Sequence, residues 1–432
     1  MPGQFHLKLP LELEDLPAAF PADHPLASPR GLLHHPRRHA ARHTQEYLYH
    51  QLIPYLGNKR KLLPLVAMAI ERSGVMGGRF FDAFAGSGVV SRLAKALGFQ
   101  VFCNDWEPYH AAINGTYIGQ NRAPALRALG GMEAAFRQLN ALAPVAGYIA
   151  THYCPADDAA PDIARERLFF TQANGRRIDA MREQIGRWWE AGQLTPAERD
   201  VLLASLLYAV CYVSNTSGVF KGFHCGWGGR SGTALYRIQS ELSLRPPIFF
   251  SNGRLNRVLS EDATALAARL DCDLAYLDPP YNQHQYGSNY HLLNTVTLWD
   301  QPPVNPTILV NGRTVDKSAI RRDWRTLRRS AYCYRHRALG EFCQLLDRVR
   351  ARMVLVSYSS DGIIALPDLV GALADRGSLS CVCQRYKRYR VSATRPSHRA
   401  HNVEFVLILD RRGPARRDAP AVLARISGQW PQ

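Results

Sequence analysis

The chain has 432 residues, a formal net charge of +17 at pH 7 and a sequence pI near 9.7. Hydrophobic residues make up 46% of it, an ordinary globular composition that excludes a fibrous or wholly disordered chain. The positive surplus favours a polyanionic partner, namely DNA, RNA or an acidic membrane surface. No apolar run approaches the roughly 20 residues that span a bilayer, so an integral membrane protein is not expected.

The N-terminal sequence and the cysteines indicate the compartment. The N-terminus, MPGQFHLKLPLELEDLP, lacks a basic start followed by an apolar core and does not resemble a secretory signal. Nine scattered cysteines without a CxxC pair favour reduced thiols in a cytoplasmic protein. The close pair Cys381 and Cys383 has no second pair nearby, so no metal site is expected and the cysteines are interpreted as core residues.

The N-terminal quarter predicts an arm followed by one βαβ unit. Residues 1–45 are rich in Pro, His and Arg and are interpreted as a flexible basic arm. A helix is expected after Gly57-Asn58-Lys59, with Asn58 as its N-cap. An apolar strand over residues 79–84 then leads into Gly86-Ser87-Gly88, a helix and a second strand over residues 99–103. This order predicts a βαβ unit of about thirty residues.

The remaining elements predict a larger α/β fold. Residues 107–250 are mostly helical in pattern, and residues 214–232 are glycine-rich, aromatic and basic and are interpreted as loops. Strand patterns return at four places, residues 273–277, 353–358, 381–389 and 403–409. Strands that alternate with helices predict a mostly parallel sheet. Residues 413–432 are rich in Arg, Pro and Ala and are expected to form a loose tail.

The first chemical motif is a glycine turn, Asp82-Ala83-Phe84-Ala85-Gly86-Ser87-Gly88. Glycines after a strand permit backbone conformations that other side chains forbid, and let a ligand lie against the turn and the helix N-terminus. The spacing differs from the dinucleotide pattern GxGxxG, so a pyrophosphate is not indicated. Asp82 can accept a hydrogen bond from an ammonium group, and Asp105, which ends the next strand, can hold ribose hydroxyls. Taken alone, this turn also fits any α/β nucleotide binder.

The second chemical motif, Asp278-Pro279-Pro280-Tyr281, follows an apolar strand. Open α/β sheets bind ligands at the carboxyl ends of their strands. Two prolines fix the turn and remove two backbone donors, which leaves a carbonyl acceptor, a carboxylate acceptor and an aromatic face. That set suits an aromatic amine whose two hydrogens are accepted by the carboxylate and a proline carbonyl while Tyr281 stacks on the ring. These four residues are therefore the candidate catalytic residues.

The motifs together resemble the D12 class of adenine-specific DNA methyltransferases, the Dam-like alpha group. Tyr55-Leu56-Gly57-Asn58-Lys59 comes first, the glycine turn second, Asp105 third and Asp278-Pro279-Pro280-Tyr281 last, in the order of the family. The sequence NQHQYGSNYHLLNT after the last motif also resembles the family. The resemblance implies an α/β, Rossmann-like methyltransferase sheet with an inserted, mostly helical target-recognition region. The expected boundaries are a catalytic domain over 46–110 and 255–412 and an insertion over 111–254.

The resemblance also implies a cofactor, S-adenosylmethionine, and a set of residues that bind it. Lys59 is implied near the methionine carboxylate, Asp105 on the ribose and Asp262 at the cofactor adenine. The cofactor-binding residues expected in this way are Tyr55, Gly57, Asn58, Lys59, Asp82, Phe84, Gly86, Ser87, Gly88, Asp105, Asp262 and Asp278. Double-stranded DNA is the implied substrate, and a restriction endonuclease of the same specificity is the implied partner.

Two segments that interleave cations with aromatic residues, residues 321–337 and 385–399, are candidates for DNA contact. Arginine and lysine neutralise phosphates, and aromatic rings stack on exposed bases. The alternative is that these two segments form a solvent-exposed strand face and a loop that bind no nucleic acid. The candidate DNA-binding residues from these segments and from the glycine-rich loop are Lys221, His224, Trp227, Arg321, Arg322, Arg325, Arg385, Lys387 and Arg388.

Direct methyl transfer to the N6 amino group of a flipped adenine is the expected reaction. Methylation of cytosine C5 needs a cysteine nucleophile, usually after proline, and the chain contains only the reverse order at Cys154-Pro155. Methylation of cytosine N4 uses the same amino chemistry and stays open, as does an RNA adenine target. A non-catalytic DNA-binding protein with this fold is a further alternative, which the intact motifs disfavour.

Overall fold

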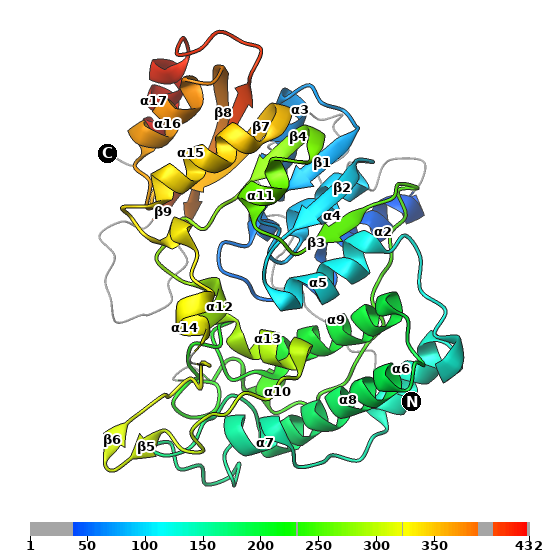
Figure 1. Ribbon diagram of the computed structural model, residues 1–432. Coiled ribbons are helices and arrows are strands. Elements are labelled where there is room, and N and C mark those ends of the chain that lie inside the picture. The colour runs from blue at the N-terminus through cyan, green and yellow to red at the C-terminus, as the bar shows by residue number, and fades with distance from the viewer. Residues whose placement is uncertain (1–37, 230–231, 322, 388–400, 430–432) are drawn as a thin grey trace.

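A seven-stranded sheet forms the centre of the fold. The computed structural model describes residues 38–229, 232–321, 323–387 and 401–429. The strand order is β3-β2-β1-β4-β7-β9-β8, with parallel pairing from β3 to β7 and antiparallel pairing of β9 with both neighbours (Figure 1). The strands are β1 (Arg79–Asp82), β2 (Gln100–Asn104), β3 (Arg257–Leu259), β4 (Asp271–Leu277), β7 (Arg350–Ser359), β8 (Ser378–Lys387) and β9 (His401–Asp410). The predicted α/β fold with a mostly parallel sheet is confirmed.

Helices cover both faces of this sheet, so its central strands are apolar on both sides. Phe80 of β1 and Leu274 of β4 pair on one face, and Phe81 and Ala275 pair on the other. The first face is covered by α2 (Arg38–Tyr49), η2 (Lys59–Leu62), α3 (Leu63–Arg72) and α4 (Val89–Ala96). The second face is covered by α11 (Ala263–Ala267), α15 (Ala338–Arg348), α16 (Leu366–Ala374) and α17 (Ala419–Ser427).

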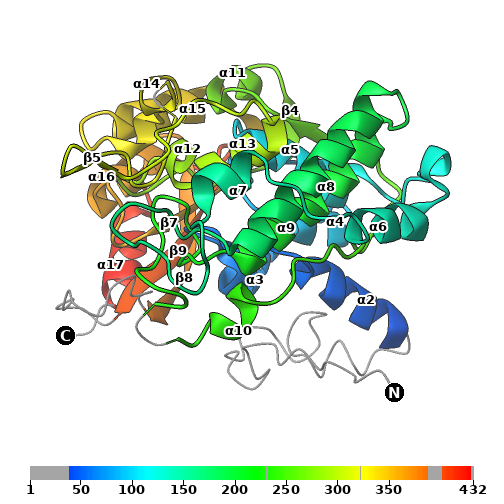
Figure 2. The ribbon, with the colours of Figure 1, turned by 90° about the horizontal axis from the view of Figure 1, so that it is seen from below.

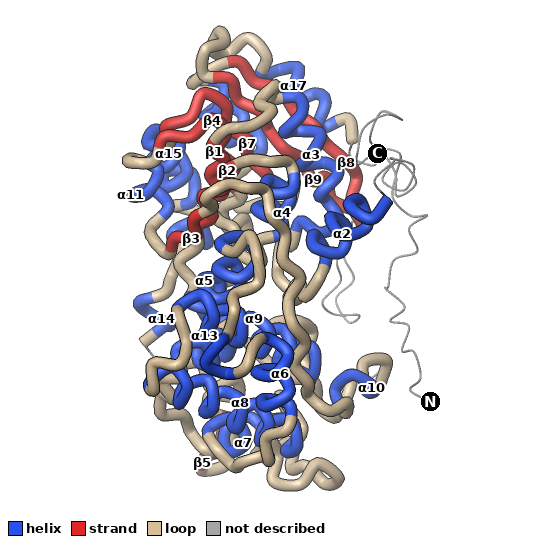
Figure 3. Tube along the Cα trace, turned by 90° about the vertical axis from the view of Figure 1, so that its right-hand side faces the viewer, coloured by secondary structure: helices blue, strands red, loops and turns tan. Residues whose placement is uncertain are grey.

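A helical lobe lies at the end of the molecule opposite the sheet (Figures 1 and 3), and Figure 2 views the molecule from the side of this lobe. Its first part leaves the sheet after β2 and comprises α5 (Pro108–Asn114), η3 (Gly115–Gly119), η4 (Arg127–Leu129), α6 (Met132–Asn140), α7 (Tyr148–Tyr153), α8 (Gln172–Glu190), α9 (Pro196–Val213) and α10 (Leu235–Ile238). The chain returns to the lobe after β4 with α12 (Tyr286–Asn289), α13 (His291–Leu298), the small hairpin β5 (Leu309–Val310) and β6 (Arg313–Thr314), and α14 (Trp324–Leu327). It then passes through η5 (Ala331–Cys333), which packs against α15 and buries Tyr332 in the core of the second sheet face.

Helix α9 runs through the middle of the helical lobe. A capping box starts it, because the Thr195 hydroxyl accepts from the Glu198 amide while the Glu198 carboxylate accepts from the Thr195 amide. Apolar residues occur all around this helix, which is the pattern of a helix buried on every side. It packs against α5, α8 and α13, so it joins the lobe to the segments that leave β2 and β4.

Three expected boundaries differ from the structure. The end of the expected arm, from Arg38, is helical in α2, whose Tyr47 and Leu48 are buried against the sheet lobe. The expected loose tail contains α17, which buries Val422 and Ile426 against β8 and α16, so that expectation was wrong. Within the expected catalytic domain, residues 302–317 fasten to the helical lobe, because the Arg167 guanidinium donates to carbonyls of Asn305, Asp316 and Lys317. Arginine-rich composition concealed the two helices, and the attachment of residues 302–317 depends on contacts with the distant Arg167. Residues 1–37 lie outside the described part of the chain. Within the described ranges, no helix has the length and apolarity needed to cross a bilayer.

Candidate active site

A cavity of about 240 Å³ opens at the carboxyl ends of β1, β2 and β4, where an open α/β sheet binds its ligands. Segments from distant parts of the sequence form its wall, namely 55–59, 82–90, 104–106, 261–264, 276–281 with Tyr286, and 329–341. The structure therefore brings together the expected catalytic residues and the expected cofactor residues, except that Gly86 and Gly88 shape the turn without lining the cavity.

The glycine turn is required by two close contacts. Gly86 and Gly88 have φ values of +51° and +77°, which other residues rarely adopt. A Cβ at Gly86 would lie 2.5 Å from the Tyr55 ring, and one at Gly88 would lie 1.7 Å from the side-chain oxygen of Asn114. Asn114 in turn donates to the Gly86 carbonyl at 3.2 Å. The turn thus fits between the first motif and α5 only if these positions lack side chains.

A buried ion pair joins the first motif to the last. The Lys59 ammonium lies 2.8 and 2.7 Å from the two carboxylate oxygens of Asp278 and donates to the Gly57 carbonyl at 3.1 Å. Burial alone would lower the pKa of Lys59, but the Asp278 carboxylate holds that pKa above the ordinary lysine value. Burial raises the pKa of Asp278, and the Lys59 charge opposes this rise. Lys59 is therefore protonated and fixed beside the corner.

Two tyrosines hold the first motif in place, Tyr286 of α12 and Tyr290 between α12 and α13. The Leu56 amide donates to the Tyr290 hydroxyl at 2.7 Å, and the Tyr286 hydroxyl donates to the Leu56 carbonyl at 3.0 Å. Tyr55 stacks on Tyr290 at a centroid distance of 4.9 Å. Asn58 caps η2 by accepting from the Arg60 amide, as the sequence predicts. The segment after Tyr281 is therefore part of the same assembly as residues 55–59.

Asp82 and Asp105 carry the acidic groups of the opposite wall. Asp82 accepts from the Ser91 hydroxyl at 2.7 Å through Oδ2, and its buried Oδ1 has no hydrogen-bond partner among the described residues. Burial, opposed by Ser91, raises the pKa of Asp82 to about 7. Asp105 accepts from the amides of Gly86 and Glu107, so its carboxylate is fixed at the end of β2. The unpartnered oxygen of Asp82 offers an acceptor for a ligand.

The arginine-dense segment after α14 contributes to the cavity wall. Tyr332 packs edge-on against Phe84 at a centroid distance of 5.3 Å, and Asp262 caps α11 through the Ala265 amide across the same end of the cavity. Sequence reasoning assigned this stretch to DNA contact and missed Tyr332 as a wall residue. The surrounding arginines concealed it, and no periodicity marks it. Trp106 and Tyr286, which also line the cavity, were likewise missed, although Tyr286 falls within the family-like NQHQYGSNYHLLNT stretch.

The candidate DNA-binding residues lie in three places. Lys221 is exposed in the glycine-rich loop, which the Phe220 amide fastens at 2.7 Å to the carbonyl of Asn289, the last residue of α12. The Trp227 indole N–H is used within the protein, because it donates to the Asp158 carbonyl. Arg321 forms a two-point pair with Asp323 at 2.8 and 2.7 Å and also bonds Asp300.

The remaining candidate DNA-binding residues belong to the segments 321–337 and 385–399. Arg385 is exposed on the edge strand β8. Arg325 lies in α14 and Lys387 ends β8, but their side chains lie outside the described part of the chain, as do residues Arg322 and Arg388.

A buried asparagine shapes the glycine-rich loop. The Asn215 amide group donates to the carbonyls of Leu168, His224 and Gly226, and its oxygen accepts from the Gly228 amide. The His224 amide donates back to the Asn215 carbonyl at 3.0 Å. One side chain therefore ties both arms of the loop to the core of the helical lobe.

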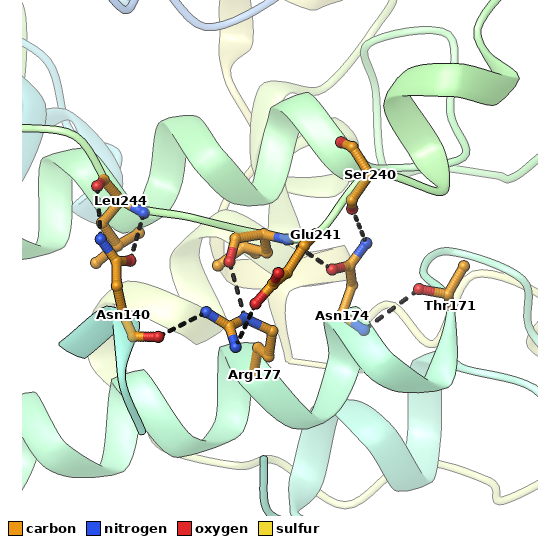
Figure 4. A network of polar contacts seen from close by, with 8 residues as sticks. Asn140, Thr171, Asn174, Arg177, Ser240, Glu241 and Leu244 are labelled. Atoms are coloured by element: carbon orange, nitrogen blue, oxygen red, sulfur yellow. Dashed lines mark hydrogen bonds and ion pairs between the residues drawn. The ribbon is translucent and has the colours of Figure 1, made fainter. Parts of the chain in front are cut away.

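The extended segment after α10 is held by a ladder of polar side chains, drawn in Figure 4. Asn174 donates to the carbonyls of Ile238 and Ser240 and accepts from the Leu242 amide. Asn140 both donates to and accepts from Leu244. Arg177 adds a bond to the Leu242 carbonyl and an ion pair with Glu241 at 2.8 Å. These side chains serve the extended segment as a neighbouring strand would, and fix the path back to the sheet.

Comparison with known proteins agrees with the geometry. A family model described as D12 class N6 adenine-specific DNA methyltransferase matches residues 55–311. The chain is 31% identical over 364 residues to the type II methyltransferase M.NlaIII of Neisseria lactamica, a match that covers 83% of this chain and 99% of that protein. It is 28% identical over 363 residues to the type II methyltransferase M.CviAII of Paramecium bursaria Chlorella virus 1, with 83% and 99% covered.

A longer relative also matches. The chain is 29% identical over 377 residues to the modification methylase LlaI of Lactococcus lactis subsp. lactis, where the match covers 85% of this chain and 56% of that protein. The chain thus spans M.NlaIII and M.CviAII almost completely but about half of LlaI. With the family motifs gathered around one cavity, the chain belongs to the D12 class of N6 adenine-specific DNA methyltransferases and transfers a methyl group to the N6 amino group of adenine in DNA.

Proposed function

We propose that the cavity binds S-adenosylmethionine as the methyl donor and that the Asp278–Tyr281 corner presents a flipped adenine to it. The Lys59–Asp278 ion pair carries this proposal, because it joins the cofactor side of the cavity to the catalytic corner at 2.7–2.8 Å. The glycine turn, Asp105 and the corner all border the same cavity of about 240 Å³.

The residues of the cavity fit the chemistry of this cofactor. The unpartnered Oδ1 of Asp82 fits the methionine ammonium group, and the Lys59 ammonium fits its carboxylate. Asp105 keeps lone pairs for ribose hydroxyls after accepting from two amides. Asp262 lies at the far end with Phe84 and Tyr332, where an adenine ring fits between apolar walls. When bound, the cofactor supplies an electrophilic methyl group on a sulfonium.

The catalytic corner is built to hold an aromatic amine. The target base leaves the stack because its amino group cannot be reached within the duplex, at a cost of a few kcal/mol that DNA contacts offset. Asp278 and a proline carbonyl accept the two N6 hydrogens, and Tyr281 stacks on the base. Tyr281 is fixed for this task by Tyr358 at a centroid distance of 5.6 Å and by the bond from the Ile363 amide to its carbonyl. Positioning and fixed dipoles supply most of the acceleration.

The glycine-rich loop is the proposed DNA contact nearest the corner. Lys221 is exposed there and His224 is half-buried; Asn215 bonds the His224 carbonyl, and the Ser318 hydroxyl donates to the Lys221 carbonyl. A preformed loop loses little conformational freedom when it enters a groove. The pairing of Arg321 with two carboxylates makes it a poorer phosphate ligand than Lys221. Arg385, on the edge of the sheet, is a second proposed contact.

The relatives named modification methylases support a restriction partner. We propose that the chain protects a DNA site against an endonuclease of the same specificity. Expression in a methylation-free host, followed by sequencing for N6-methyladenine, identifies the site. Plasmid from that host should resist an endonuclease that cuts there. Efficient cleavage of fully methylated sites would contradict this role.

Replacement of Asp278 by alanine tests the catalytic proposal. Asp278→Ala should reduce the single-turnover methylation rate by roughly 100-fold or more, since the acceptor for the N6 hydrogens is gone. DNA affinity should change little, because the carboxylate contributes no phosphate contact. Gel-shift titration and tritium transfer from labelled cofactor measure the two quantities. A variant that methylates at the wild-type rate would refute the assigned role.

Replacement of Asp82 by asparagine separates cofactor binding from stability. The pKa of Asp82 is raised from 3.8 to about 7 by burial, so between these values the folded state holds a proton that the unfolded state has lost. The stability contribution of Asp82 therefore falls as pH rises through this window. Asp82→Asn should be more stable than wild type by on the order of 1–3 kcal/mol above pH 7, and not near pH 4.

The same substitution should lower the affinity for the cofactor, although it raises the stability of the folded protein above pH 7. Loss of the charged acceptor should weaken S-adenosylmethionine binding by roughly 10- to 100-fold. Chemical denaturation at several pH values and calorimetric titration give the two measurements. Equal or lower stability at pH 8 together with unchanged cofactor affinity would show that Asp82 has neither role.

Replacement of Lys221 by alanine tests whether the glycine-rich loop contacts DNA. Lys221→Ala should weaken DNA binding at every sequence and lower the slope of log affinity against log salt by about one. Cofactor affinity should stay the same. Arg137→Ala is the matched control, because Arg137 is an exposed cation on α6 with only a weak pair to Glu133. An unchanged salt slope in Lys221→Ala, or an equal effect in the control, would remove the loop from the interface.

A further inference from the structure

The turn after β2 is held by a side chain from a distant part of the sequence. Asp105, Trp106 and Glu107 join β2 to α5, and the first two line the cavity. The Arg328 guanidinium donates to the Trp106 carbonyl through Nη1 at 2.9 Å, and the same nitrogen lies 3.9 Å from the Glu107 carboxylate. Arg328 directly follows α14 and precedes the cavity wall formed by residues 329–341. This contact therefore joins that wall to the 105–107 turn.

The conformation of the 105–107 turn determines where the Asp105 carboxylate points. Its Oδ2 accepts from the Gly86 amide at 2.9 Å, and its Oδ1 accepts from the Glu107 amide at 3.1 Å. The Glu107 amide and the Trp106 carbonyl belong to one peptide unit, which is planar and turns as a single body. Arg328 bonds the carbonyl end of this unit, and Asp105 bonds its amide end. A change in the first contact is therefore transmitted directly to the second.

Asn294 of α13 fixes the other side of the turn. Its amide group donates to the Glu107 carboxylate at 2.5 Å, and its side-chain oxygen accepts from the Tyr109 amide in the first turn of α5 at 3.2 Å. Burial raises the pKa of Glu107 to about 7, and the Asn294 amide, the Arg328 charge and the Trp106 side chain oppose that rise. The start of α5 is thus secured by α13, whereas the peptide unit before it is secured by Arg328.

The structure holds Arg328 ready for this contact. Its guanidinium lies over the ring of the buried Trp324, 5.1 Å from the ring centroid. The Ser330 amide donates to the Gln285 side chain at 2.7 Å, and that side chain donates back to the Ser330 carbonyl at 3.3 Å, which fastens the segment beside α12 (Figure 1). A Cβ at Gly287 of α12 would lie 3.0 Å from the Arg328 Cβ. A long side chain confined in this way loses little further entropy on bonding.

We infer that Arg328 is a positioning residue for cofactor binding, which fixes the peptide unit between Trp106 and Glu107 and thereby aims Asp105 at the cofactor ribose. This inference rests on the proposed function, which assigns the ribose hydroxyls to Asp105. Arg328 also polarises the carbonyl that it bonds, so the amide of the same unit becomes a better donor to Asp105. Arg328 lies outside residues 55–311, the range matched by the family model.

A double-mutant cycle tests this role by calorimetric titration with S-adenosylhomocysteine in the absence of DNA. Arg328→Met keeps much of the apolar stem but cannot donate a hydrogen bond, and should weaken binding by roughly 5- to 20-fold. Asp105→Ala removes the group through which Arg328 acts, so the double variant should bind no more weakly than Asp105→Ala alone. Because no DNA is present, a lost phosphate contact cannot cause the effect.

Methylation kinetics separate positioning of the cofactor from a general loss of structure. At saturating S-adenosylmethionine and DNA, the single-turnover rate of Arg328→Met should stay within about twofold of wild type, while the KM for the cofactor rises. Arg335→Met is the matched control, because Arg335 is exposed in the same segment and does not line the cavity. Its affinity for S-adenosylhomocysteine should equal that of wild type.

Wild-type affinity in Arg328→Met overturns the inference, as does an equal loss in Arg335→Met. Losses that multiply in the double variant also overturn it, because Arg328 would then act independently of Asp105. If Arg328→Met fails to fold, Arg328→Gln, which is shorter and uncharged, replaces it under the same criteria. Wild-type affinity in Asp105→Ala defeats the proposed ribose contact itself. A loss in Asp105→Ala beside an unaffected Arg328→Met leaves the proposed function standing and removes only the role of Arg328.

Discussion

A buried ion pair between Lys59 and Asp278 is the contact on which the site depends. Ion pairs removed from water gain little net stability, because desolvation offsets their attraction, but breaking one is costly. Such a pair therefore fixes geometry more than it adds stability. Here it joins two segments separated by 219 residues, one at the start of η2 and one at the end of β4. The glycine turn and the Tyr286 and Tyr290 contacts to Leu56 are arranged around it.

The site also holds an acidic group that costs the unliganded protein stability. Asp82 is buried with one unpartnered oxygen. Functional sites often keep such groups because the ligand satisfies them. In the helical lobe, by contrast, the buried side chains of Asn215, Asn174 and Asn140 bond the backbone of otherwise irregular segments. The protein thus combines a preformed scaffold with a site that its ligands complete.

The sequence predicts those parts of the structure that depend only on residues close together in the chain. An apolar strand, two glycines and a following helix can form only a sharp turn, and Asn58 was identified as a cap because its role needs only the next two residues. The four-residue corner was identifiable because prolines fix a turn at a strand end. The family assignment, which rests on the motif order and the relatives, excludes two of the alternatives that the sequence left open. These are methylation of an adenine in RNA and a non-catalytic role.

The features that escaped prediction depend on distant contacts. Strand β3 has three residues and carries no alternating pattern, so only its pairing with β2 defines it. Tyr332 stands in an arginine-rich stretch, and its place in the cavity wall follows from packing on Phe84. Arg321 looked like a phosphate ligand until the fold placed Asp300 and Asp323 beside it.

The central claim is that Lys59 and Asp278 act as one unit in methyl transfer, and a double-mutant cycle measures this directly. Single-turnover rates of Lys59→Met, Asp278→Asn and the double variant are compared with wild type at saturating cofactor. If the two residues work through their mutual contact, the double variant should be no slower than the slower single variant. Losses that multiply, so that each substitution acts independently of the other, would contradict the account.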